Sequence, residues 1–406
     1  FTDAMKRVAD YEIVIVGAAI AGLTLACHLM GKGLRIAILN KDNNQASSAK
    51  STSNLASQLR VIAITLGSQQ LLEKLQVWQR LTAEQRAPFR SLQVWEPAKQ
   101  ANLFFDSAEL GQATLGYIVK NQDLQDALFT QVKTDQKISW FSSDALIDMV
   151  HEPHQMRLTL ASGVSITTSL VVGADGMHSS VRQLAGLQVN ASDYDQVALI
   201  ATVRTELAHE EMARQIFLPT GPLAFLPLAD PYHCSIVWST TPEEARLFKS
   251  MSDPLFCAEL AQVFEQRLGA IESTSPRVSF PLKTQQAEHY IKSAMALIGD
   301  AAHVIHPLAG QGANLGIADA DCLAKIILAA KLKQRSLGAL HTLRAYERQR
   351  RFHNRLMNGS VDGIKYLFAT KNPLLRKTRQ FGFSVLNKIP ALKNGIARYA
   401  MGNPKI

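Results

Sequence analysis

Residues 11–40, YEIVIVGAAIAGLTLACHLMGKGLRIAILN, decide the fold of this 406-residue chain. The apolar run at 13–16 predicts a buried strand, Gly17 a tight turn, the stretch to about Met30 a helix, and residues 34–39 a second strand. A strand, a helix and a strand in this order form a βαβ unit, which is the building block of α/β domains with a parallel sheet. The stretch therefore predicts an α/β fold.

The turn of this βαβ unit resembles the G-x-G-x-x-G dinucleotide fingerprint, with two departures. Gly17 and Gly22 hold the first and third glycine positions, but Ala19 holds the second, where a glycine lets a pyrophosphate come close. Asn40 ends the second strand where a ribose-binding acid is expected, and an amide binds a hydroxyl more weakly than a carboxylate does. Such a turn can also serve helix packing alone. The complete βαβ order favours a Rossmann-like domain that binds a dinucleotide.

A second glycine-marked turn follows a predicted strand in LVVGADGMHSSVR, residues 170–182. The strand is expected to end at Gly173, Asp175 and Gly176 form a turn, and a helix that contains Arg182 begins at about Ser179. Asp-Gly is a common turn dipeptide, so this stretch by itself carries little information.

A third turn of the same kind lies in AMALIGDAAHVIHPLAGQGANLGIADADCLAKIIL, residues 294–328. It predicts a strand at 296–298, the pair Gly299-Asp300, a loop and a long helix from about Gln311. Ligands of open α/β sheets bind at the carboxyl ends of the strands. We therefore expect the three turns, although far apart in sequence, to meet around one ligand.

The composition predicts a globular protein of two domains. Apolar residues make up 47% and charged residues 19% of the chain, and its length exceeds that of one ordinary domain. The four cysteines have no CxxC or metal-ligand spacing, which argues against a disulfide framework or a metal site and favours a reducing cytoplasm. We expect no transmembrane segment and no signal peptide, because neither apolar pattern is present.

The net charge of +9 is concentrated in the tail. Residues 331–406 carry 17 Lys and Arg against Glu347 and Asp362, a balance of +15, which leaves −6 for the rest of the chain. The tail also mixes these cations with Leu, Phe and Ile at roughly helical spacing. We expect the tail to meet an anionic lipid surface or a partner enzyme, or to pack on its own protein or a second subunit; nucleic acid is not expected.

The order of these turns resembles that of the FAD-dependent aromatic hydroxylases, which are class A flavoprotein monooxygenases of the para-hydroxybenzoate hydroxylase type. The resemblance covers nearly the whole chain. Within that group the chain is most similar to the ubiquinone-biosynthesis hydroxylases. The stretches that carry this similarity are RVIAITLGSQQLLEKLQVW (60–78), LGYIVKNQDLQDAL (115–128), AFLPLADPYHCSIVWS (224–239) and GDAAHVIHPLAGQGANLG (299–316).

The resemblance implies the site residues. Asp300 holds a ribitol hydroxyl of FAD, and Asp175 and Gly176 serve the FAD pyrophosphate and passing NAD(P)H. The backbone of Gly310, Gln311 and Gly312, at a helix N-terminus, faces the pyrimidine edge of the isoalloxazine, where reduction places negative charge.

The resemblance implies a role for several further residues, and each of them also has an alternative role. Arg60 matches an arginine near the flavin, the alternative being a surface salt bridge of little energy. Asn121 matches a position that contacts FAD, and it equally suits a helix cap. For His303 and His306 we favour a hydrogen-bonded structural role, and His303 is kept as a pocket candidate.

The resemblance also gives the domain plan. A composite FAD-binding domain is expected from residues 5–70, 111–185 and 286–335, a mixed-sheet substrate domain from 71–110 and 186–285, and a basic helical region from 336–406. Phe217, Phe225 and Trp238 are candidate walls of the substrate pocket, although an aromatic residue in a strand is more often part of the core.

The family's reaction implies that NAD(P)H reduces FAD, that O2 then adds, and that the resulting flavin hydroperoxide hydroxylates a phenol, here a polyprenylated phenol favoured at C5. The sequence identifies no catalytic base, prenyl length or oligomeric state, and a homo-oligomer is left open. We expect a cytoplasmic protein, with a place at the periphery of the inner membrane left open.

Three other classes of protein are alternatives to a hydroxylase. A non-catalytic lipid- or flavin-binding scaffold stays open because Ala19 and Asn40 weaken the nucleotide fingerprint. A disulfide-based flavin oxidoreductase is disfavoured because Cys27 and Cys234 have no nearby cysteine in the sequence. A flavin halogenase is disfavoured because its tryptophan-bearing signature is not visible.

Overall fold

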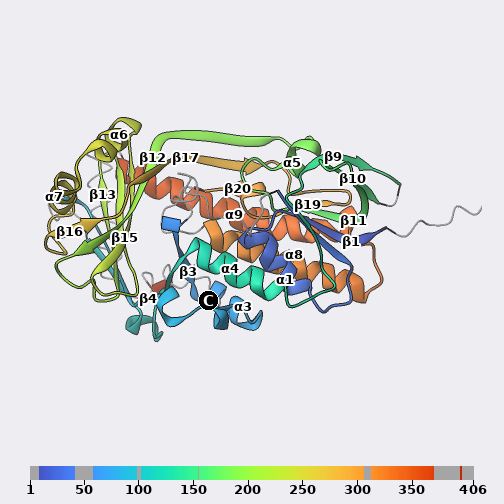
Figure 1. Cartoon of the computed structure of the whole chain (residues 1–406), viewed down its shortest axis with the longest axis horizontal. Helices are drawn as coiled ribbons and strands as arrows, with labels where there is room; N and C mark the ends of the chain where they lie inside the picture. Colours follow the sequence, from blue (N-terminus) through green and yellow to red (C-terminus); the bar gives the residue numbers. More distant parts are fainter. Residues whose placement is uncertain are drawn as a thin grey trace, which may run out of the picture.

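The computed structural model describes residues 9–41, 58–97, 102–153, 155–305, 312–369 and 394–395. Gly310, Gln311 and His306, and most of the tail beyond residue 369, lie outside the described residues. Figure 1 shows an elongated molecule with a sheet in each half and long strands that run between the halves.

The sheet on the right of Figure 1 is mainly parallel, and its strands run in the order β18, β19, β11, β1, β2 and β8. Their bounds are β1 Tyr11–Val16, β2 Ile36–Asn40, β8 Ser139–Ser142, β11 Ser165–Gly173, β18 Ile291–Lys292 and β19 Met295–Leu297. β9 (Leu146–His151) and β10 (Met156–Leu160) extend from β11 in antiparallel fashion. The predicted βαβ unit is confirmed, with β1 and β2 parallel and in direct register.

Helices cover this sheet. α1 (Ile20–Leu29) packs against both α4 (Asn121–Val132) and α8 (Gly312–Leu332), and α9 (Leu340–Ala369) packs on α8. α1 is apolar around most of its circumference, and such a helix belongs in an interior. Its Leu23, Leu25 and Leu29 are fully buried in the larger hydrophobic core together with β1.

The second sheet is mixed, as expected, and runs in the order β20, β17, β12, β15, β14, β13, β5 and β6, with β16 beside β12. β13 and β5 are parallel, and the other neighbours are antiparallel. The bounds are β5 Ser91–Trp95, β6 Asn102–Asp106, β12 Val189–Thr205, β13 Met212–Leu218, β14 Gly221–Pro227, β15 His233–Thr240, β16 Ile271–Thr274, β17 Val278–Ala287 and β20 His303–Val304. The long strands β12 and β17 join the two halves along the top of Figure 1.

One face of the second sheet is covered by α6 (Pro242–Ser250) and α7 (Asp253–Val263). Trp238 of β15 stacks on Phe248 of α6, and the ring centroids are 4.3 Å apart. Phe225 of β14 stacks on Phe264, just after α7, at 3.8 Å. These contacts form a second hydrophobic core beneath the two helices.

A small sheet of β3 (Val61–Thr65), β7 (Gly116–Lys120) and β4 (Ala87–Phe89) lies beside α3 (Leu66–Lys74). Leu72, Val77 and Trp78 pack in the larger core. We therefore propose that the first piece of the substrate domain begins near Ser91, where β5 enters the second sheet, and not at residue 71. The other domain boundaries remain as proposed from the sequence.

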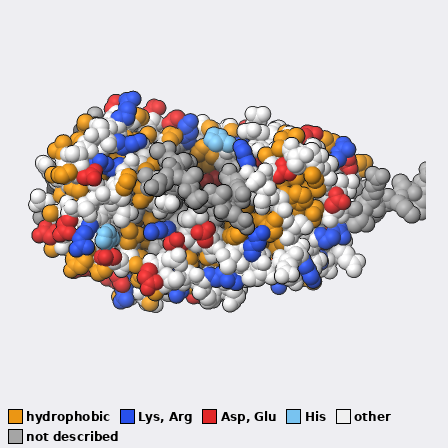
Figure 2. Space-filling model, viewed as in Figure 1, with side chains coloured by type: hydrophobic (Ala, Val, Ile, Leu, Met, Phe, Trp, Pro, Cys, Tyr) orange, Lys and Arg blue, Asp and Glu red, His pale blue; other side chains and the backbone are white. Residues whose placement is uncertain are grey.

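No helix within the described ranges is long and apolar enough to cross a membrane. Cys27, Cys234, Cys257 and Cys322 all lie in described parts of the chain and are unpaired. Figure 2 shows cationic and anionic side chains interspersed over both halves of one face. Residues 331–369 carry +7 of the tail's +15, so about half of this excess positive charge lies outside the described residues.

His209 is a buried histidine that fixes a loop of the second half. Its Nε2 lies 3.0 Å from the carbonyl oxygen of Leu228 and 3.1 Å from that of Asp230, while its Nδ1 accepts the Glu211 N–H at 3.0 Å. This arrangement requires the neutral ring, with the proton on Nε2. Burial lowers the pKa of His209 below the ordinary value of 6.5.

Acidification is therefore expected to destabilise the protein through His209. The unfolded chain takes up a proton near pH 6.5 and the folded chain does so only at lower pH, so stability falls as the pH drops below about 6.5. Urea unfolding at pH 8 and pH 5.5 measures this, and His209→Gln should reduce the difference between the two. An unchanged difference in the variant would show that other groups cause it.

Candidate functional site

The three glycine-marked turns lie side by side at the carboxyl ends of neighbouring strands of the mainly parallel sheet. β11 is parallel to both β1 and β19, and Val16, Gly173 and Leu297 stand in register at the ends of the three strands. The backbone links continue just beyond these ends: the Ala174 N–H donates to the Val16 carbonyl at 2.7 Å, and the Ile298 N–H to the Gly173 carbonyl at 2.9 Å. The predicted convergence of the three turns is confirmed.

Close backbone approach explains the glycines of the first turn. Gly17 has φ +110°, and a Cβ on it would lie 2.3 Å from the carbonyl oxygen of Ala174 in the second turn. A Cβ on Gly22 would lie 2.1 Å from the Gly17 carbonyl oxygen. Ala19 is different, because it is exposed and has ordinary extended angles (φ −92°, ψ −177°). The missing second glycine therefore causes no backbone strain.

The N-terminus of α1 faces these strand ends and suits an anion. Its first turn contains no acidic residue, and the Leu23 N–H makes the first intrahelical bond, to the Ala19 carbonyl. The helix dipole and the amide groups before Leu23 are suited to a pyrophosphate. Gln125 of α4 donates to the Ala18 carbonyl at 3.3 Å and so holds the turn from the other side. Gln125 could not be predicted as part of the site, because a glutamine inside a helix belongs to no motif.

Asp175 in the second turn has a local structural role. Its Oδ2 accepts the N–H groups of Ser180 at 2.6 Å and Val181 at 3.3 Å, and thereby caps the short helix α5 (Ser180–Leu184). Its Oδ1 is buried without a hydrogen-bond partner among the described residues. Gly176 has φ +81°, which is left-handed backbone that favours glycine. One carboxylate oxygen thus supports the turn, and the other is left as a potential acceptor for a ligand.

Arg182 ties the second turn to the third. The residue is only 5% exposed, and its guanidinium donates to the Ala301 carbonyl at 2.8 Å and to the Met177 carbonyl at 2.6 Å. Burial lowers the pKa of Arg182, and the nearby Asp175 opposes this effect. The sequence placed this arginine correctly in a helix but did not indicate its partners.

Replacing Arg182 by methionine is expected to lower the free energy of unfolding by about 3 kcal/mol, because buried carbonyl groups and Asp175 lose their charged partner. Urea denaturation measures the loss. Arg157→Met is the matched control, because the exposed Arg157 pairs with Glu152 at the surface and should cost under about 1 kcal/mol. Equal losses in the two variants would contradict the assignment.

Asp300 lies in the third turn, in a short 3-10 helix Gly299–Ala301. The side chain reaches solvent, but the surrounding protein desolvates the carboxylate and raises its pKa, while His303 and Arg60 act in the opposite direction. Gly299 has φ +59°, and a Cβ there would lie 2.9 Å from the Cβ of Ala21 in α1. The third turn is therefore pressed against the first.

Arg60 lies close enough to Asp300 to affect its pKa, and a backbone hydrogen bond joins Arg60 to Asn121. The Arg60 carbonyl accepts the Asn121 N–H at 2.9 Å, and the Arg60 guanidinium lies 5.2 Å from the ring centroid of Phe280 in β17. Asn121 is the first residue of α4, and Lys120 occupies the cap position without a side-chain cap bond. The alternative that Asn121 caps the helix is therefore wrong. Asn40 is found at the carboxyl end of β2, as predicted.

His303 is a buried hydrogen-bonded group, which is the role favoured from the sequence. It is 1% exposed, and its Nε2 lies 2.5 Å from Asp319 Oδ2. Burial alone would raise the pKa of Asp319, but His303 and Arg350 outweigh burial and lower it to about 2. His303 therefore pairs with a carboxylate inside the protein and does not line an open pocket. The sequence did not point to Asp319 or Arg350.

The three candidate pocket aromatics do not share a face of the second sheet. Phe225 and Trp238, 1% and 2% exposed, belong to the core beneath α6 and α7, so we no longer propose them as pocket walls. Phe217 follows Ile216, a member of that core, and therefore points to the opposite face. Phe280, which Arg60 contacts, also lies on that opposite face, because its partner Ala198 alternates with the core residue Leu199. Phe217 remains a proposed pocket residue, and Phe280 joins it.

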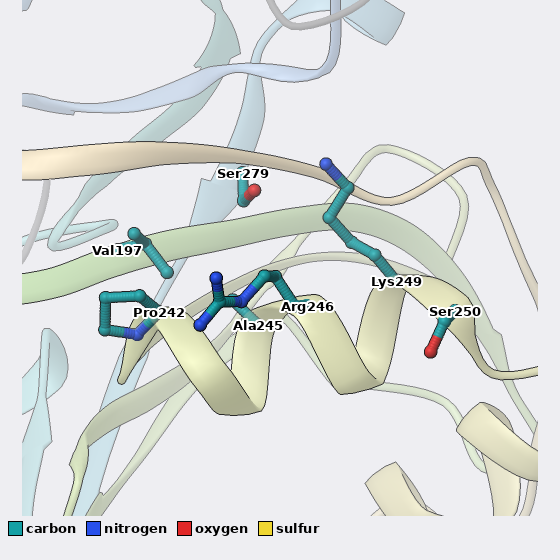
Figure 3. Close-up of a pocket in the computed structure, with 7 residues that line it drawn as sticks. All are labelled: Val197, Pro242, Ala245, Arg246, Lys249, Ser250 and Ser279. Atoms are coloured by element: carbon teal, nitrogen blue, oxygen red, sulfur yellow. The ribbon is translucent and has the colours of Figure 1, made fainter.

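A hollow of about 460 Å³ lies elsewhere, between α6 and the strands β12 and β17. Figure 3 shows Arg246 and Lys249 on α6 and Val197 and Ser279 on the two strands. Val197 and Ser279 lie on the sheet face that α6 and α7 cover, opposite to Phe280. The hollow is therefore separate from the three turns.

The family model and several relatives that match this chain name FAD binding or ubiquinone hydroxylation. The family model for an FAD binding domain matches residues 10–358. The chain is 34% identical over 391 residues to 3-demethoxyubiquinol 3-hydroxylase of Escherichia coli (strain K12), covering 96% of this chain and 98% of the relative. It is 32% identical to ubiquinone hydroxylase UbiL of Rhodospirillum rubrum, with 100% and 92% covered, and 33% identical to the mitochondrial ubiquinone biosynthesis monooxygenase COQ6 of Xenopus tropicalis, with 97% and 93% covered.

Among solved structures, p-nitrophenol 4-monooxygenase PnpA of Pseudomonas putida matches with a TM-score of 0.77 at 16% identity, over 98% of this chain and 99% of the other. PqsL of P. aeruginosa, in complex with 2-aminobenzoylacetate, matches with a TM-score of 0.76 at 20% identity, over 92% and 99%. At these identities the two structures support the fold alone.

Proposed function

The chain belongs to the family of FAD-dependent aromatic hydroxylases that includes the ubiquinone-biosynthesis hydroxylases, and on this premise we propose that it hydroxylates the ring of a polyprenylated phenol on the way to ubiquinone. The names of relatives that match along almost the whole chain support this substrate class. The chain is accordingly an FAD-dependent monooxygenase.

The observation that carries the proposal is the meeting of three turns at the ends of β1, β11 and β19. The groups present there suit FAD. The N-terminus of α1 is suited to the pyrophosphate, and the Asp300 carboxylate to a ribitol hydroxyl. Bound FAD would supply the oxygen-activating chemistry of the hydroxylase family. NADH or NADPH is the proposed reductant.

The protein's own residues bind and orient the reactants in this proposal. Arg60, Asn121 and Asn40 complete the cofactor site, and the N-terminal end of α8 at Gly312 is proposed to lie near the flavin ring. We propose that the phenol lies against the sheet face that carries Phe217 and Phe280, and that this face helps to exclude water. No residue is assigned as a catalytic base.

Purified protein tests the activity directly. We expect yellow protein that consumes NADH or NADPH rapidly only when a phenol is present. Protein that stays colourless after incubation with FAD would contradict the proposal and favour a lipid-binding scaffold of the same fold.

For the ring position we propose C5, and the name of the Escherichia coli relative gives 3-hydroxylation as the second candidate. Bacterial strains that each lack one ubiquinone hydroxylase can be complemented with this chain and their quinone intermediates read by mass spectrometry. Restored ubiquinone only in the strain that lacks the C5 hydroxylase supports C5. Restoration only in another strain would overturn that position.

For the basic tail we propose docking on anionic lipid at the periphery of the inner membrane, or on a partner enzyme. Cations interleaved with apolar residues support this. Sedimentation with anionic liposomes tests the lipid proposal, because removal of the residues after about 360 should abolish co-sedimentation. Unchanged binding by the shortened chain would reject it.

A further inference from the structure

A buried polar network lies directly behind the third turn. Asp319 of α8 is fully buried and uses both carboxylate oxygens. Oδ2 accepts the Gly299 N–H at 3.0 Å and lies 2.5 Å from His303 Nε2. Oδ1 accepts Arg350 Nε at 2.6 Å and Asn354 Nδ2 at 3.3 Å. One carboxylate therefore joins the third turn to two side chains of α9.

The segment that Asp319 holds connects the two sheets. It leaves the mainly parallel sheet at the end of β19, passes through Asp300, and joins the second sheet as β20, where His303 pairs with Gln286 of β17. Asp319 binds this segment at Gly299 and at His303, one residue before and three residues after Asp300. The backbone around Asp300 is thus fixed at both ends by one carboxylate.

The rest of the network fixes Asp319 in turn. Arg350 Nη2 donates to Asn354 Oδ1 at 2.9 Å, and Asn354 Nδ2 lies 3.4 Å from the hydroxyl of the buried Tyr290. With Arg350 on one side and His303 and the Gly299 amide on the other, the Asp319 carboxylate is charge-balanced, which a buried acid requires. Such a satisfied network holds its members in a single arrangement.

We propose that Asp319, held in place by Arg350, is a positioning residue that sets the Asp300 carboxylate for FAD. The inference rests on the proposed function, in which Asp300 binds the cofactor. Asp319 is fully buried, so it acts on Asp300 indirectly, through the Gly299 amide and His303. Arg350 couples α9 to the cofactor site through the same carboxylate.

The test uses the full-length protein and measures the dissociation constant of FAD by flavin fluorescence, at a temperature where every variant is folded. Asp319→Asn keeps the shape but has a single oxygen, which cannot serve both sides of the network. We expect FAD to bind about tenfold to a hundredfold more weakly, as when a hydrogen bond to a charged group is lost. Arg350→Met should also weaken binding, and the double variant should be no weaker than Asp319→Asn, because both residues act through one group.

Tyr346→Phe is the matched control for stability. Tyr346 is also a buried residue of α9, and its hydroxyl donates to the Leu297 carbonyl at 2.6 Å, so the variant loses a buried hydrogen bond without touching residues 299–303. It should unfold at lower urea and bind FAD like the wild type.

FAD affinity of Asp319→Asn equal to that of Tyr346→Phe would overturn the positioning role, as would additive effects of the Asp319 and Arg350 variants. A wild-type protein that binds no FAD would instead contradict the proposed function, so the two failures are distinguishable.

Discussion

Replacing Gly22 by alanine is expected to lower the free energy of unfolding by about 3 kcal/mol and to abolish tight FAD binding. The new methyl group would lie 2.1 Å from the Gly17 carbonyl oxygen and 3.1 Å from the Ala174 Cβ. The first of these atoms is backbone, which cannot turn aside as a flexible side chain can. Either α1 moves away from the turn, or the turn moves away from the second strand end, and overpacking of this kind is costly. Urea unfolding and flavin fluorescence measure the two effects.

Gly359→Ala is the control for this substitution. Gly359 is also a helical glycine without positive φ, and a Cβ there would meet no described atom within 4 Å apart from its chain neighbours and its own helix backbone. Alanine should stabilise α9 at this position by up to about 1 kcal/mol. A Gly22→Ala protein as stable as the wild type, with unchanged FAD binding, would show that the first turn and α1 are not packed as described.

Replacing Asp300 by alanine is expected to weaken FAD binding about tenfold to a hundredfold while the protein stays folded. The lost group is a carboxylate proposed to accept a ribitol hydroxyl, and hydrogen bonds to charged groups contribute in this range. The side chain reaches solvent, so its removal leaves no cavity in the core. Fluorescence titration with FAD gives the affinity, and thermal unfolding checks the fold.

The raised pKa of Asp300 leads us to expect that FAD affinity depends on pH. Because desolvation raises its pKa above the ordinary 3.8, the carboxylate takes up a proton at a higher pH than an exposed aspartate does. FAD affinity of the wild type should therefore decline on acidification before ordinary carboxylates titrate, and the alanine variant should lose this decline. Asp321→Ala serves as the control, since Asp321 lies on α8 and pairs with Lys325. Equal FAD affinities in the Asp300 variant, the Asp321 variant and the wild type would show that Asp300 does not contribute to FAD binding.

The first half of the cofactor site could be predicted from the sequence because its determinants are local. Gly17 and Gly22 are spaced by the geometry of one turn and one helix, and the apolar runs around them fix β1 and α1. The meeting of the three turns was predictable for a related reason, since parallel strands bring their carboxyl ends to the same edge.

The buried network behind Asp300 could not be predicted, because its members lie in segments whose packing no local pattern specifies. Asp319 and Arg350 are 31 positions apart and look like ordinary polar residues of two helices. Only the packing of α9 on α8 brings them together.

That Phe225 and Trp238 belong to the core beneath α6 and α7, whereas Phe217 does not, could not be predicted from the sequence for a different reason. Alternation along a strand separates two faces, but it does not say which face the helices cover. Phe225 and Trp238 lie on the face under α6 and α7, whereas Phe217 lies on the other. The decision depends on where α6 and α7 pack, which the strand pattern does not contain.

Hydrogen exchange of the backbone amides, measured with and without FAD, tests most directly whether one cofactor is held by all three turns. We expect FAD to slow exchange together in residues 17–22, 174–180 and 299–304, with one FAD bound per chain. Protection in only one of these segments, or in none of them, would contradict the shared site.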